Sequence, residues 1–494
     1  MLPVRIDPER GPWPLHDAAA SRTAEAAALA AHPPFELMER AGLAVARLAL
    51  AIAPHARRIQ VWSGPGNNGG DGSVAARHLK AAGREVRVTL VADAAQLPAD
   101  AARALTEARQ AGVPVGTDDE EPDLVIDALL GLGARRAPEG AVAAAIDRVN
   151  DRGVPVLAVD IPSGLQPNCG TLLGKVAVRA THTLSLLTLK PGCFTAQGRD
   201  LSGAVWLDTL GVDAGPATAW LAAPPTQGPR AFASHKGSHG DVLVVGGTAG
   251  MVGAAWLAAR AALAAGAGRV HTSPLDPEAS LLDTAHPELM GRRGAWRWPP
   301  EQLARSTVVC GCGGGDAVRE ALPPLVAHAG RLLLDADALN AIAADSMLQD
   351  LLRRRGARGP MTLLTPHPLE AARLLQVTAA AVQSDRLAAA RALAEKLTCA
   401  VLLKGSGTVV AAPGRVPSIN PTGNAALAGP GTGDVLAGWA GGRWAQSPGT
   451  HAADIAAAAA WDHGRAADLW PPASRGAPLR ASELIEALAR RAPH

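Results

Sequence analysis

Residues 59–72 have the sequence Ile59-Gln60-Val61-Trp62-Ser63-Gly64-Pro65-Gly66-Asn67-Asn68-Gly69-Gly70-Asp71-Gly72, and this stretch decides the class of fold. A short apolar run typical of a buried strand leads into a glycine-rich loop, and we expect a helix from about Ser73 to Ala82. Glycines free backbone N–H groups to surround an anion at the start of such a helix. An aspartate beside that cradle indicates a chemical role for Asp71.

A second glycine-rich loop closed by an aspartate lies near the other end of the chain, at Gly429-Pro430-Gly431-Thr432-Gly433-Asp434. The chain has 494 residues, a length that suits two domains better than one core. Two loops of this kind therefore predict two active sites on one polypeptide.

Strands and alanine-rich helices alternate along the first half, which predicts a doubly wound parallel sheet with helices on both faces. Ligands bind beyond the carboxyl ends of strands in such a sheet. Asp127 and Asp160 each end a predicted strand, so we expect both beside the first glycine loop. The predicted strands are residues 59–62, 86–91, 124–126 and 156–159.

A proline-rich segment, residues 213–230, reads as a linker. We expect an N-terminal domain at 1–221, a linker at 222–228 and a C-terminal domain at 229–494. The second domain repeats the α/β pattern, with a helix at about 253–265 and a final helix beginning near Asp434. Its predicted strands are residues 241–245, 269–272, 307–310, 331–334, 362–364, 401–403 and 408–411.

Composition excludes several classes of function. The net charge is +2, so no global field attracts nucleic acid or an anionic membrane. The apolar stretches 43–53 and 252–267 each contain an arginine, so we interpret them as buried helices rather than membrane spans. Five cysteines are typical of reduced thiols in a cytoplasmic enzyme. Cys310 and Cys312 could form a metal or redox pair, but no second pair with zinc spacing accompanies them.

The first loop is compatible with a dinucleotide-binding fingerprint, because Gly64, Gly66 and Gly69 have its spacing and Asp93 lies near the end of the next strand. An NAD-dependent dehydrogenase is therefore one alternative. The two asparagines of the loop, Asp71 and the acids on neighbouring strand ends favour a hard cation instead, since such an ion needs several oxygen ligands.

Four ordered motifs make the first half resemble the NAD(P)H-hydrate epimerase domain of the YjeF family. They are Met38-Glu39-Arg40-Ala41-Gly42, Gly66 to Gly72, Asp127-Ala128-Leu129-Leu130-Gly131 and Val159-Asp160-Ile161-Pro162-Ser163-Gly164, and Leu189-Lys190-Pro191-Gly192 also fits. The resemblance implies that Asp160 is the acid/base at the epimerised carbon and that K⁺ is bound by Asn68, Asp127 and Ser163. It implies substrate contacts by Asn67, Asn68, Gly69, Gly70, Asp71, Gly131, Leu132, Gly133, Ala134, Arg135, Arg136, Ala137 and Asp160.

The second loop opens a helix, so its backbone can hold a phosphoryl group while Asp434 takes a proton from a hydroxyl. The chain has no Gly-x-x-x-x-Gly-Lys-Ser/Thr motif, which excludes a P-loop NTPase. Upstream, Lys404-Gly405-Ser406-Gly407-Thr408 follows a predicted strand. Lys404 and the backbone N–H groups of this segment could contact nucleotide phosphates.

The second half resembles the ribokinase-like superfamily, and more closely the NAD(P)H-hydrate dehydratase domain of the YjeF family. Further motifs carry this resemblance: His235 to Gly240, Gly253-Ala254-Ala255, Leu334-Asp335-Ala336-Asp337-Ala338-Leu339-Asn340 and Leu364-Thr365-Pro366-His367-Pro368-Leu369-Glu370. It implies that Asp434 is catalytic. It implies substrate contacts by Ala254, Gly315, His367 and Asp434, and nucleotide contacts by Lys404, Gly405, Ser406, Gly407, Thr408 and Gly433.

The resemblance implies a bifunctional enzyme that epimerises hydrated NAD(P)H and dehydrates its S-form with ADP, or with ATP as the alternative, and Mg²⁺. One departure is the segment Gly311-Cys312-Gly313-Gly314-Gly315, where the family usually has Gly-Pro-Gly-Leu-Gly, and we expect a more flexible loop. We expect a homo-oligomer that acts on small molecules, without nucleic acid or membrane.

Other interpretations stay open from the residues alone. The chain could be a vitamin or thiazole kinase fused to a dinucleotide-binding domain, or its first domain could be a non-catalytic binding module. Taken singly, Asp127 and Asp160 could be turn formers, Asp434 a plain helix cap and His367 a buried structural histidine.

Overall fold

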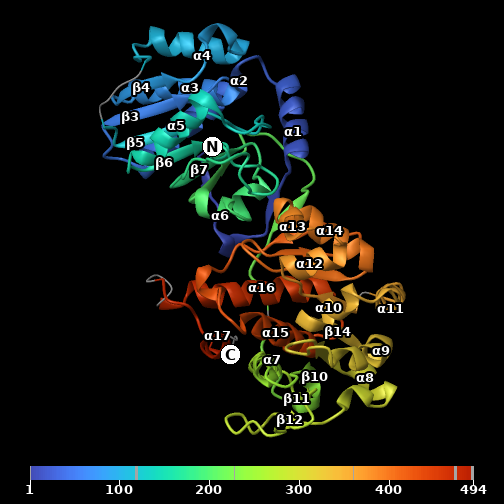
Figure 1. Cartoon of the computed structure of the whole chain (residues 1–494). Coiled ribbons are helices and arrows are strands. Elements are labelled where there is room, and N and C mark those ends of the chain that lie inside the picture. Colours follow the sequence, from blue (N-terminus) through green and yellow to red (C-terminus); the bar gives the residue numbers. More distant parts are fainter. Residues whose placement is uncertain (1, 117–120, 227, 360, 472–475, 491–494) are drawn as a thin grey trace. The chain divides into compact units, whose positions relative to one another are not determined.

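The computed structural model describes residues 2–116, 121–226, 228–359, 361–471 and 476–490. It divides into two compact units, residues 1–221 and 222–494, and each is described by itself (Figure 1). Residue 227 of the expected linker lies outside the described residues. Each unit is built on a mainly parallel sheet with helices, so the predicted two-domain α/β class is confirmed. No helix within the described ranges is long and apolar enough to cross a bilayer.

A seven-stranded sheet forms the first unit, with parallel neighbours except for its first, antiparallel strand. The four strands predicted in this half are present, but two strands that follow them in the chain, β7 and β8, were not predicted. In spatial order the strands are β1 (Val4–Arg5), β8 (Ala204–Asp208), β7 (His182–Leu186), β6 (Val156–Val159), β5 (Leu124–Ala128), β3 (Arg58–Ser63) and β4 (Glu85–Leu90).

Helices cover both faces of this sheet because side chains alternate along its buried strands. On β5, Leu124 and Ile126 pack in the core beneath α2, α3 and α4, whereas Val125 packs with α5 on the other face (Figure 1). The helices of the unit are α1 (Ala18–Ala31), α2 (Glu36–Ile52), α3 (Asn67–Ala81), α4 (Ala99–Gln110), α5 (Gly140–Asp151) and α6 (Gly198–Leu201).

Two expectations for this half are wrong in detail. Helix α3 begins at Asn67 rather than near Ser73, so most of the presumed glycine loop is the first turns of a helix. The proline-rich segment 213–230, interpreted as a linker, contains strand β9 (Ala219–Leu221), which pairs antiparallel with β2 (Trp13–Leu15). The narrower linker expected at 222–228 begins directly after this strand. Proline-rich composition favours a linker, and it does not reveal a strand whose partner lies some two hundred residues earlier.

The sheet of the second unit is parallel from β12 to β16 and ends in two antiparallel strands. All seven predicted strands are present with small shifts of their ends. Two short strands, β12 and β18, were not predicted. In spatial order the strands of this sheet within the second unit are β12 (Met290–Gly291), β11 (Arg269–Pro274), β10 (Asp241–Gly246), β13 (Thr307–Cys310), β14 (Arg331–Leu334), β15 (Thr362–Leu364), β16 (Ala400–Leu403), β17 (Val409–Ala411) and β18 (Ser418–Ile419).

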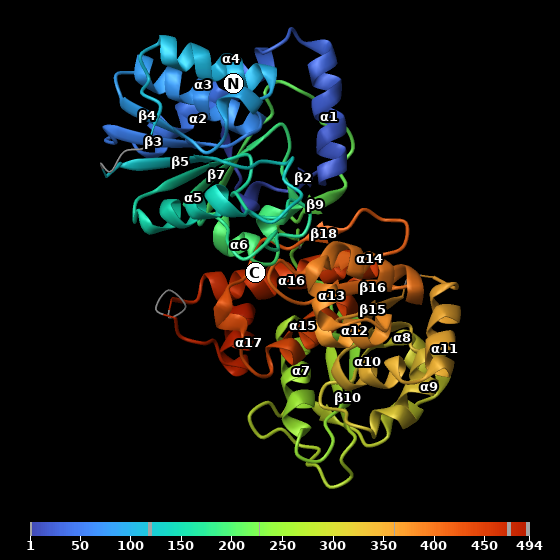
Figure 2. The ribbon, with the colours of Figure 1, turned by 45° about the horizontal axis from the view of Figure 1, so that its top comes forward.

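One face of this sheet packs against α7 (Val252–Ala264), α15 (Thr432–Gln446), α16 (Ala452–Asp468) and α17 (Ala481–Ala489). The expected final helix begins at Thr432, near Asp434, but it is not final, because α16 and α17 follow it. The remaining helices, most of them seen to the right of α7 and α15 in Figure 2, are α8 (Pro300–Arg305), α9 (Val318–His328), α10 (Ala336–Ala343), α11 (Ser346–Gly356), α12 (Pro368–Leu375), α13 (Ala379–Ser384) and α14 (Arg386–Leu397).

Helices α7 and α15 approach each other closely, and glycine makes this possible. A Cβ at Gly438 would lie 2.0 Å from the carbonyl oxygen of Ala258, and one at Gly442 would lie 2.4 Å from that of Ala262. Any side chain at these positions would push the helices apart. The close packing therefore fixes α15, and with it Asp434 in its first turn.

Candidate active sites

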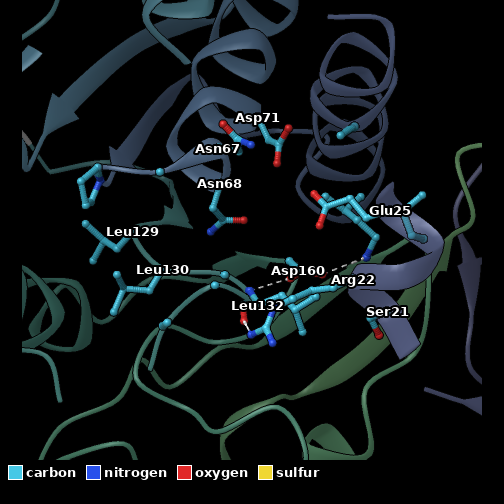
Figure 3. Close-up of a pocket in the computed structure, with 18 of the residues that line it drawn as sticks. Ser21, Arg22, Glu25, Asn67, Asn68, Asp71, Leu129, Leu130, Leu132 and Asp160 are labelled. Atoms are coloured by element: carbon cyan, nitrogen blue, oxygen red, sulfur yellow. Dashed lines mark hydrogen bonds between the residues drawn. The ribbon is translucent and has the colours of Figure 1, made fainter. Parts of the chain in front are cut away.

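A cavity of about 760 Å³ opens at the carboxyl ends of the strands of the first unit (Figure 3). Its wall brings together α1, the start of α3, the segment after β5 and the residue that follows β6. Residues expected to touch the substrate line it, namely Asn67, Asn68, Asp71, Gly131, Leu132, Gly133, Ala134, Arg135, Arg136, Ala137 and Asp160.

The glycines around the start of α3 allow close backbone packing. A Cβ at Gly64 would lie 1.7 Å from the Leu129 carbonyl oxygen, and one at Gly69 would lie 2.3 Å from the Gly64 carbonyl oxygen. A Cβ at Gly70 would meet the thioether of Met38 at 2.7 Å. Gly69 and Gly70 are therefore buried beneath the cavity wall. They were expected to contact the substrate, but they do not line the cavity.

Asp160 follows β6 with a φ of +69°, which is uncommon for a residue with a side chain. Its Oδ2 accepts a hydrogen bond of 3.0 Å from the Leu132 N–H, and Lys190 donates to its Oδ1. Lys190 is 1% exposed, and it also donates to the carbonyls of Leu186 and Thr188 at 2.7 and 2.9 Å. All three ammonium protons are used, so this buried ion pair fixes the carboxylate at the edge of the cavity.

Asp127 lies fully buried in β5, where its carboxylate has only neutral donors among the described residues. It accepts hydrogen bonds from the Ser163 hydroxyl at 2.6 Å, the Ser163 N–H at 2.9 Å and the Leu129 N–H at 3.2 Å. Burial raises the pKa of Asp127 to about 6 against the opposing effect of these bonds. Asn68 lies against Gly131, because a Cβ added at Gly131 would be 3.1 Å from Asn68 Oδ1. The buried Nδ2 of Asn68 has no partner among the described residues.

Two more carboxyl groups face the cavity, Asp71 from α3 and Glu25 from α1 (Figure 3). Burial, then Asp160 and Glu25, raises the pKa of Asp71 well above its ordinary value. Burial and Asp160 raise the pKa of Glu25, while Lys190 and Arg22 partly lower it. The cavity therefore combines one ion-paired carboxylate with two neighbouring carboxyl groups whose pKa values are raised.

In the second unit, Asp434 lies in the first turn of α15, behind the N-cap Gly431 with its φ of +82°. Since Gly431 is the N-cap, the interpretation of Asp434 as a plain helix cap is wrong. Burial and then Asp335 raise the pKa of Asp434 to about 6, and a hydrogen bond with the Cys312 thiol partly lowers it. Ligand atoms of Asp434, Asp335 and Cys312 all lie within 4.8 Å of one another.

Lys404 follows β16 and pairs with Asp335 rather than with Asp434. Its Nζ lies 2.7 Å from Asp335 Oδ1, and that oxygen also accepts a hydrogen bond of 2.9 Å from Thr365. A Cβ at Gly433 would lie 3.5 Å from the ammonium, so the start of α15 adjoins Lys404. The predicted base and the predicted phosphate-contacting lysine thus share one site.

The segment 311–315 closes this site from the side of β13. Its residues Gly311, Gly313 and Gly315 have positive φ values of 123°, 58° and 50°. The Gly315 N–H donates to Asp337 Oδ2 at 2.8 Å, and a Cβ at Gly313 would lie 2.9 Å from the Cβ of Ala254. The structure therefore places Ala254 and Gly315 at the same loop.

His367 is the N-cap of α12, with its Nδ1 accepting a hydrogen bond of 3.1 Å from the Leu369 N–H. Its side chain is 46% exposed, so the interpretation of a buried structural histidine is wrong. Burial and then Lys404 lower its pKa, which favours the neutral imidazole. Burial also raises the pKa of the adjacent Glu370 to about 7.

Both halves of the chain match family models. The model for the YjeF-related protein N-terminus matches residues 34–192, and the model for NAD(P)H-hydrate dehydratase matches residues 242–490. The bifunctional NAD(P)H-hydrate repair enzyme Nnr of Escherichia coli (strain K12) is 37% identical over 476 residues, which cover 92% of this chain and 89% of that protein. The chain belongs to the family of bifunctional NAD(P)H-hydrate repair enzymes.

Other relatives extend across the same length. The bifunctional NAD(P)H-hydrate repair enzyme of Leishmania braziliensis is 37% identical over 503 residues, which cover 91% of this chain and 88% of that protein. The second half is also similar to the ADP/ATP-dependent NAD(P)H-hydrate dehydratase of Bacillus subtilis co-crystallized with ATP/Mg²⁺. That structure is 29% identical, with a TM-score of 0.44, and the match covers 54% of this chain and 93% of that chain.

Sequence reasoning missed three charged residues of the first site, Lys190, Arg22 and Glu25. Lys190 stands in a quoted motif, but nothing in the motif indicates that its ammonium reaches Asp160 thirty positions earlier. Arg22 donates to the Leu132 carbonyl at 3.1 Å, and with Glu25 it comes from α1, a helix with no chemical signature in its sequence. The alternation of strands and helices could have indicated which strand ends are neighbours, but not which side chains meet there.

Proposed function

We propose that this enzyme epimerises the R- and S-forms of hydrated NADH and NADPH and dehydrates the S-form back to the reduced cofactor with ADP. One observation carries the proposal: each unit has its own carboxylate with a lysine nearby. Asp160 bonds to Lys190 in the cavity of the first unit, and Asp434 lies in the second unit at the start of α15, which adjoins Lys404. Membership of the bifunctional family supports two linked reactions on one substrate.

In the first unit, Asp160 exchanges a proton at the hydroxyl-bearing carbon or its hydroxyl while Lys190 keeps the carboxylate oriented. The side chains of Asn67, Asn68 and Asp71 and the segment 131–137 surround the substrate in this proposal. Burial raises the pKa of Asp71 well above its ordinary value, and its carboxyl group would form a hydrogen bond with the substrate.

The residues expected to bind K⁺ suit a hard cation. Asp127 contributes a buried carboxylate that no cation among the described residues neutralises, and its raised pKa shows that burial disfavours its charge. Ser163 and Asn68 add hydroxyl and amide oxygens beside it, and K⁺ prefers such oxygen ligands. When bound, the ion would neutralise Asp127 and hold the start of α3 against the segment after β5.

In the second unit, Asp434 takes the proton of the substrate hydroxyl, and that oxygen attacks the terminal phosphorus of ADP, releasing AMP. The lone pair of the ring nitrogen then expels phosphate, and loss of a ring proton restores the reduced cofactor. Ala254, Gly315 and His367 would contact the hydrate. Residues Lys404, Gly405, Ser406, Gly407, Thr408 and Gly433 would contact the nucleotide.

Mg²⁺ would enter this site together with the nucleotide. Two carboxylates of this site already have partners: Asp335 bonds to Lys404, and Asp434 forms a hydrogen bond with the Cys312 thiol. Phosphate oxygens and water are therefore the ligands that we expect for the ion, as is common for Mg²⁺ bound with a nucleotide. The ion would neutralise charge on the transferred phosphoryl group.

The test is to mix the full chain with chemically prepared hydrate of both epimers, ADP, Mg²⁺ and K⁺, and to follow the near-ultraviolet absorbance of the dihydronicotinamide. Complete recovery is expected. Recovery of one epimer's share alone would contradict the epimerase half, and no recovery with ADP or ATP would contradict both halves. A stable phosphoester of an alcohol would instead favour the small-molecule kinase. We further propose a cytoplasmic homo-oligomer, to be checked by light scattering and by fractionation.

A further inference from the structure

Arg386 is a cation buried behind the segment Lys404–Thr408. It is the first residue of α14 and is 1% exposed. Its Nη2 donates to the carbonyl oxygens of Leu403 and Lys404 at 3.2 and 3.1 Å. The guanidinium therefore holds the end of β16 in place from the buried side of the strand.

The charge of this guanidinium has no counter-ion among the described residues. Its partners are two carbonyls and the amide oxygen of Gln383 at 2.7 Å, while its buried Nε has no partner there. The carboxylate of Asp335 bonds to Lys404 and not to Arg386. Burial lowers the pKa of Arg386 to about 10, so the side chain stays charged at neutral pH. Buried charges are ordinarily paired, so an unpaired one indicates an anionic ligand.

The hydrogen bonds from Arg386 also determine which backbone groups of the segment Lys404–Thr408 face the solvent. The Lys404 carbonyl and the Gly405 N–H belong to one planar trans peptide and point in opposite directions. Since the carbonyl points to Arg386, the Gly405 N–H points away from it, and it donates no hydrogen bond within the described residues. Gly405 has a φ of +141°, and a Cβ there would lie 2.6 Å from Arg386 Nη1, so only glycine fits against the guanidinium.

We infer that Arg386 is a positioning residue for nucleotide diphosphates: it fixes the Gly405 N–H toward the phosphates and supplies the positive charge that a diphosphate neutralises. The inference rests on the proposed nucleotide-binding role of Lys404–Thr408. A purely structural arginine would hold β16 and α14 together and affect all nucleotides equally. A residue that acts on phosphate charge would favour ADP over AMP, because only the added β-phosphate changes between these ligands.

The test compares ADP and AMP binding to the full-length protein by calorimetry. Arg386→Gln retains amide donors but removes the charge, and Arg391→Gln removes an exposed arginine from the same helix as a matched control. We expect Arg386→Gln to weaken ADP binding at least tenfold and AMP binding about threefold or less. The KM for ADP should rise with little change in kcat, and epimerase activity should be unchanged. Arg391→Gln should bind both nucleotides like the wild type.

Equal losses for ADP and AMP, or no loss of ADP affinity, would overturn the inference. If Arg386→Gln does not fold, the second variant is Arg386→Lys, which keeps the charge but loses the two hydrogen bonds to the carbonyls. It should still weaken ADP binding more than AMP binding, with a smaller difference between the two nucleotides than is expected for Arg386→Gln. Equal losses again refute the inference. Failure of the wild type itself to bind ADP would refute the proposed nucleotide site instead, so the two failures are distinguishable.

Discussion

The two candidate catalytic carboxylates, Asp160 and Asp434, differ in how a neighbouring lysine is used. In the first unit Lys190 bonds to Asp160 itself. In the second unit Lys404 bonds to Asp335, and burial raises the pKa of Asp434 to about 6. An ion pair fixes a charged group in place, whereas a pKa near neutrality suits a base that must accept a proton. The two sites should therefore respond differently to loss of a lysine and to pH.

Replacing each carboxylate by its amide gives the largest effects. Asp434→Asn should lower ADP-dependent recovery about 10³-fold or more, since the base is lost. Asp160→Asn should leave recovery of the S-form intact and lower conversion of the R-form about 10²- to 10⁴-fold, so that absorbance stalls partway. Both are measured with the mixed hydrate. Complete loss of absorbance recovery in Asp160→Asn, or fast full recovery in Asp434→Asn, would contradict the assignment of one activity to each unit.

Stability distinguishes lost chemistry from misfolding in Asp434→Asn. A raised pKa means that the ionised form is less favourable in the fold than in the unfolded chain. The neutral amide should therefore stabilise the protein at pH 7 by about 1–3 kcal/mol, given a shift of about two pKa units at 1.4 kcal/mol per unit. Asp316→Asn, at a fully exposed side chain, should change the free energy of unfolding by less than about 0.5 kcal/mol.

Loss of the lysine tests the other half of the comparison. Lys190→Met leaves a buried carboxylate without its cation, which should destabilise the first unit by about 3–5 kcal/mol and lower epimerase activity about 10²-fold. Dehydration of the S-form by the same protein is the internal reference. Lys175→Met, at an exposed lysine, should alter neither quantity. Epimerisation by Lys190→Met at the wild-type rate would mean that Asp160 needs no ion pair.

The pH dependence of dehydration should follow Asp434. Its carboxyl acts as a base only after losing its proton, and its pKa is about 6. The rate should therefore be flat above about pH 7 and should fall tenfold for each pH unit well below 6. The measurement is kcat/KM for the S-hydrate between pH 4.5 and 8.5 at saturating ADP. A rate that is still flat down to pH 5 would show that burial does not tune this carboxylate.

The comparison also shows where sequence reasoning succeeds. Strands such as β5 and β13 were predicted because runs of branched apolar residues leave little choice of structure. Asp127 and Asp160 were placed correctly at one edge of the sheet because parallel strands bring their carboxyl ends together. The start of α3 was missed, since asparagine and glycine are poor helix formers and tertiary packing overrides that propensity here.

The partners of the carboxylates could not be predicted in the same way. Asp160 and Lys190 are thirty residues apart, and their pairing depends on β7, a strand that the sequence pattern did not reveal. Asp335 and Lys404 likewise meet only after β14, β15 and β16 have assembled side by side. Motifs therefore locate the chemical groups, while the pairing that sets their charge is a property of the assembled sheet.

The smallest expected effect concerns Cys312, the second neighbour of Asp434. Its buried thiol lowers the pKa of Asp434 through a hydrogen bond. Cys312→Ala should therefore move the midpoint of the dehydratase pH profile upward by less than one unit, with a loss of rate of a few-fold at pH 6 and almost none at pH 8. Cys312→Ser keeps a donor and should hold the midpoint at or below that of the wild type. Cys310→Ala, at a buried thiol whose pKa burial alone raises, should leave the profile unchanged. A uniform loss at every pH would mean that the thiol supports the loop rather than the base.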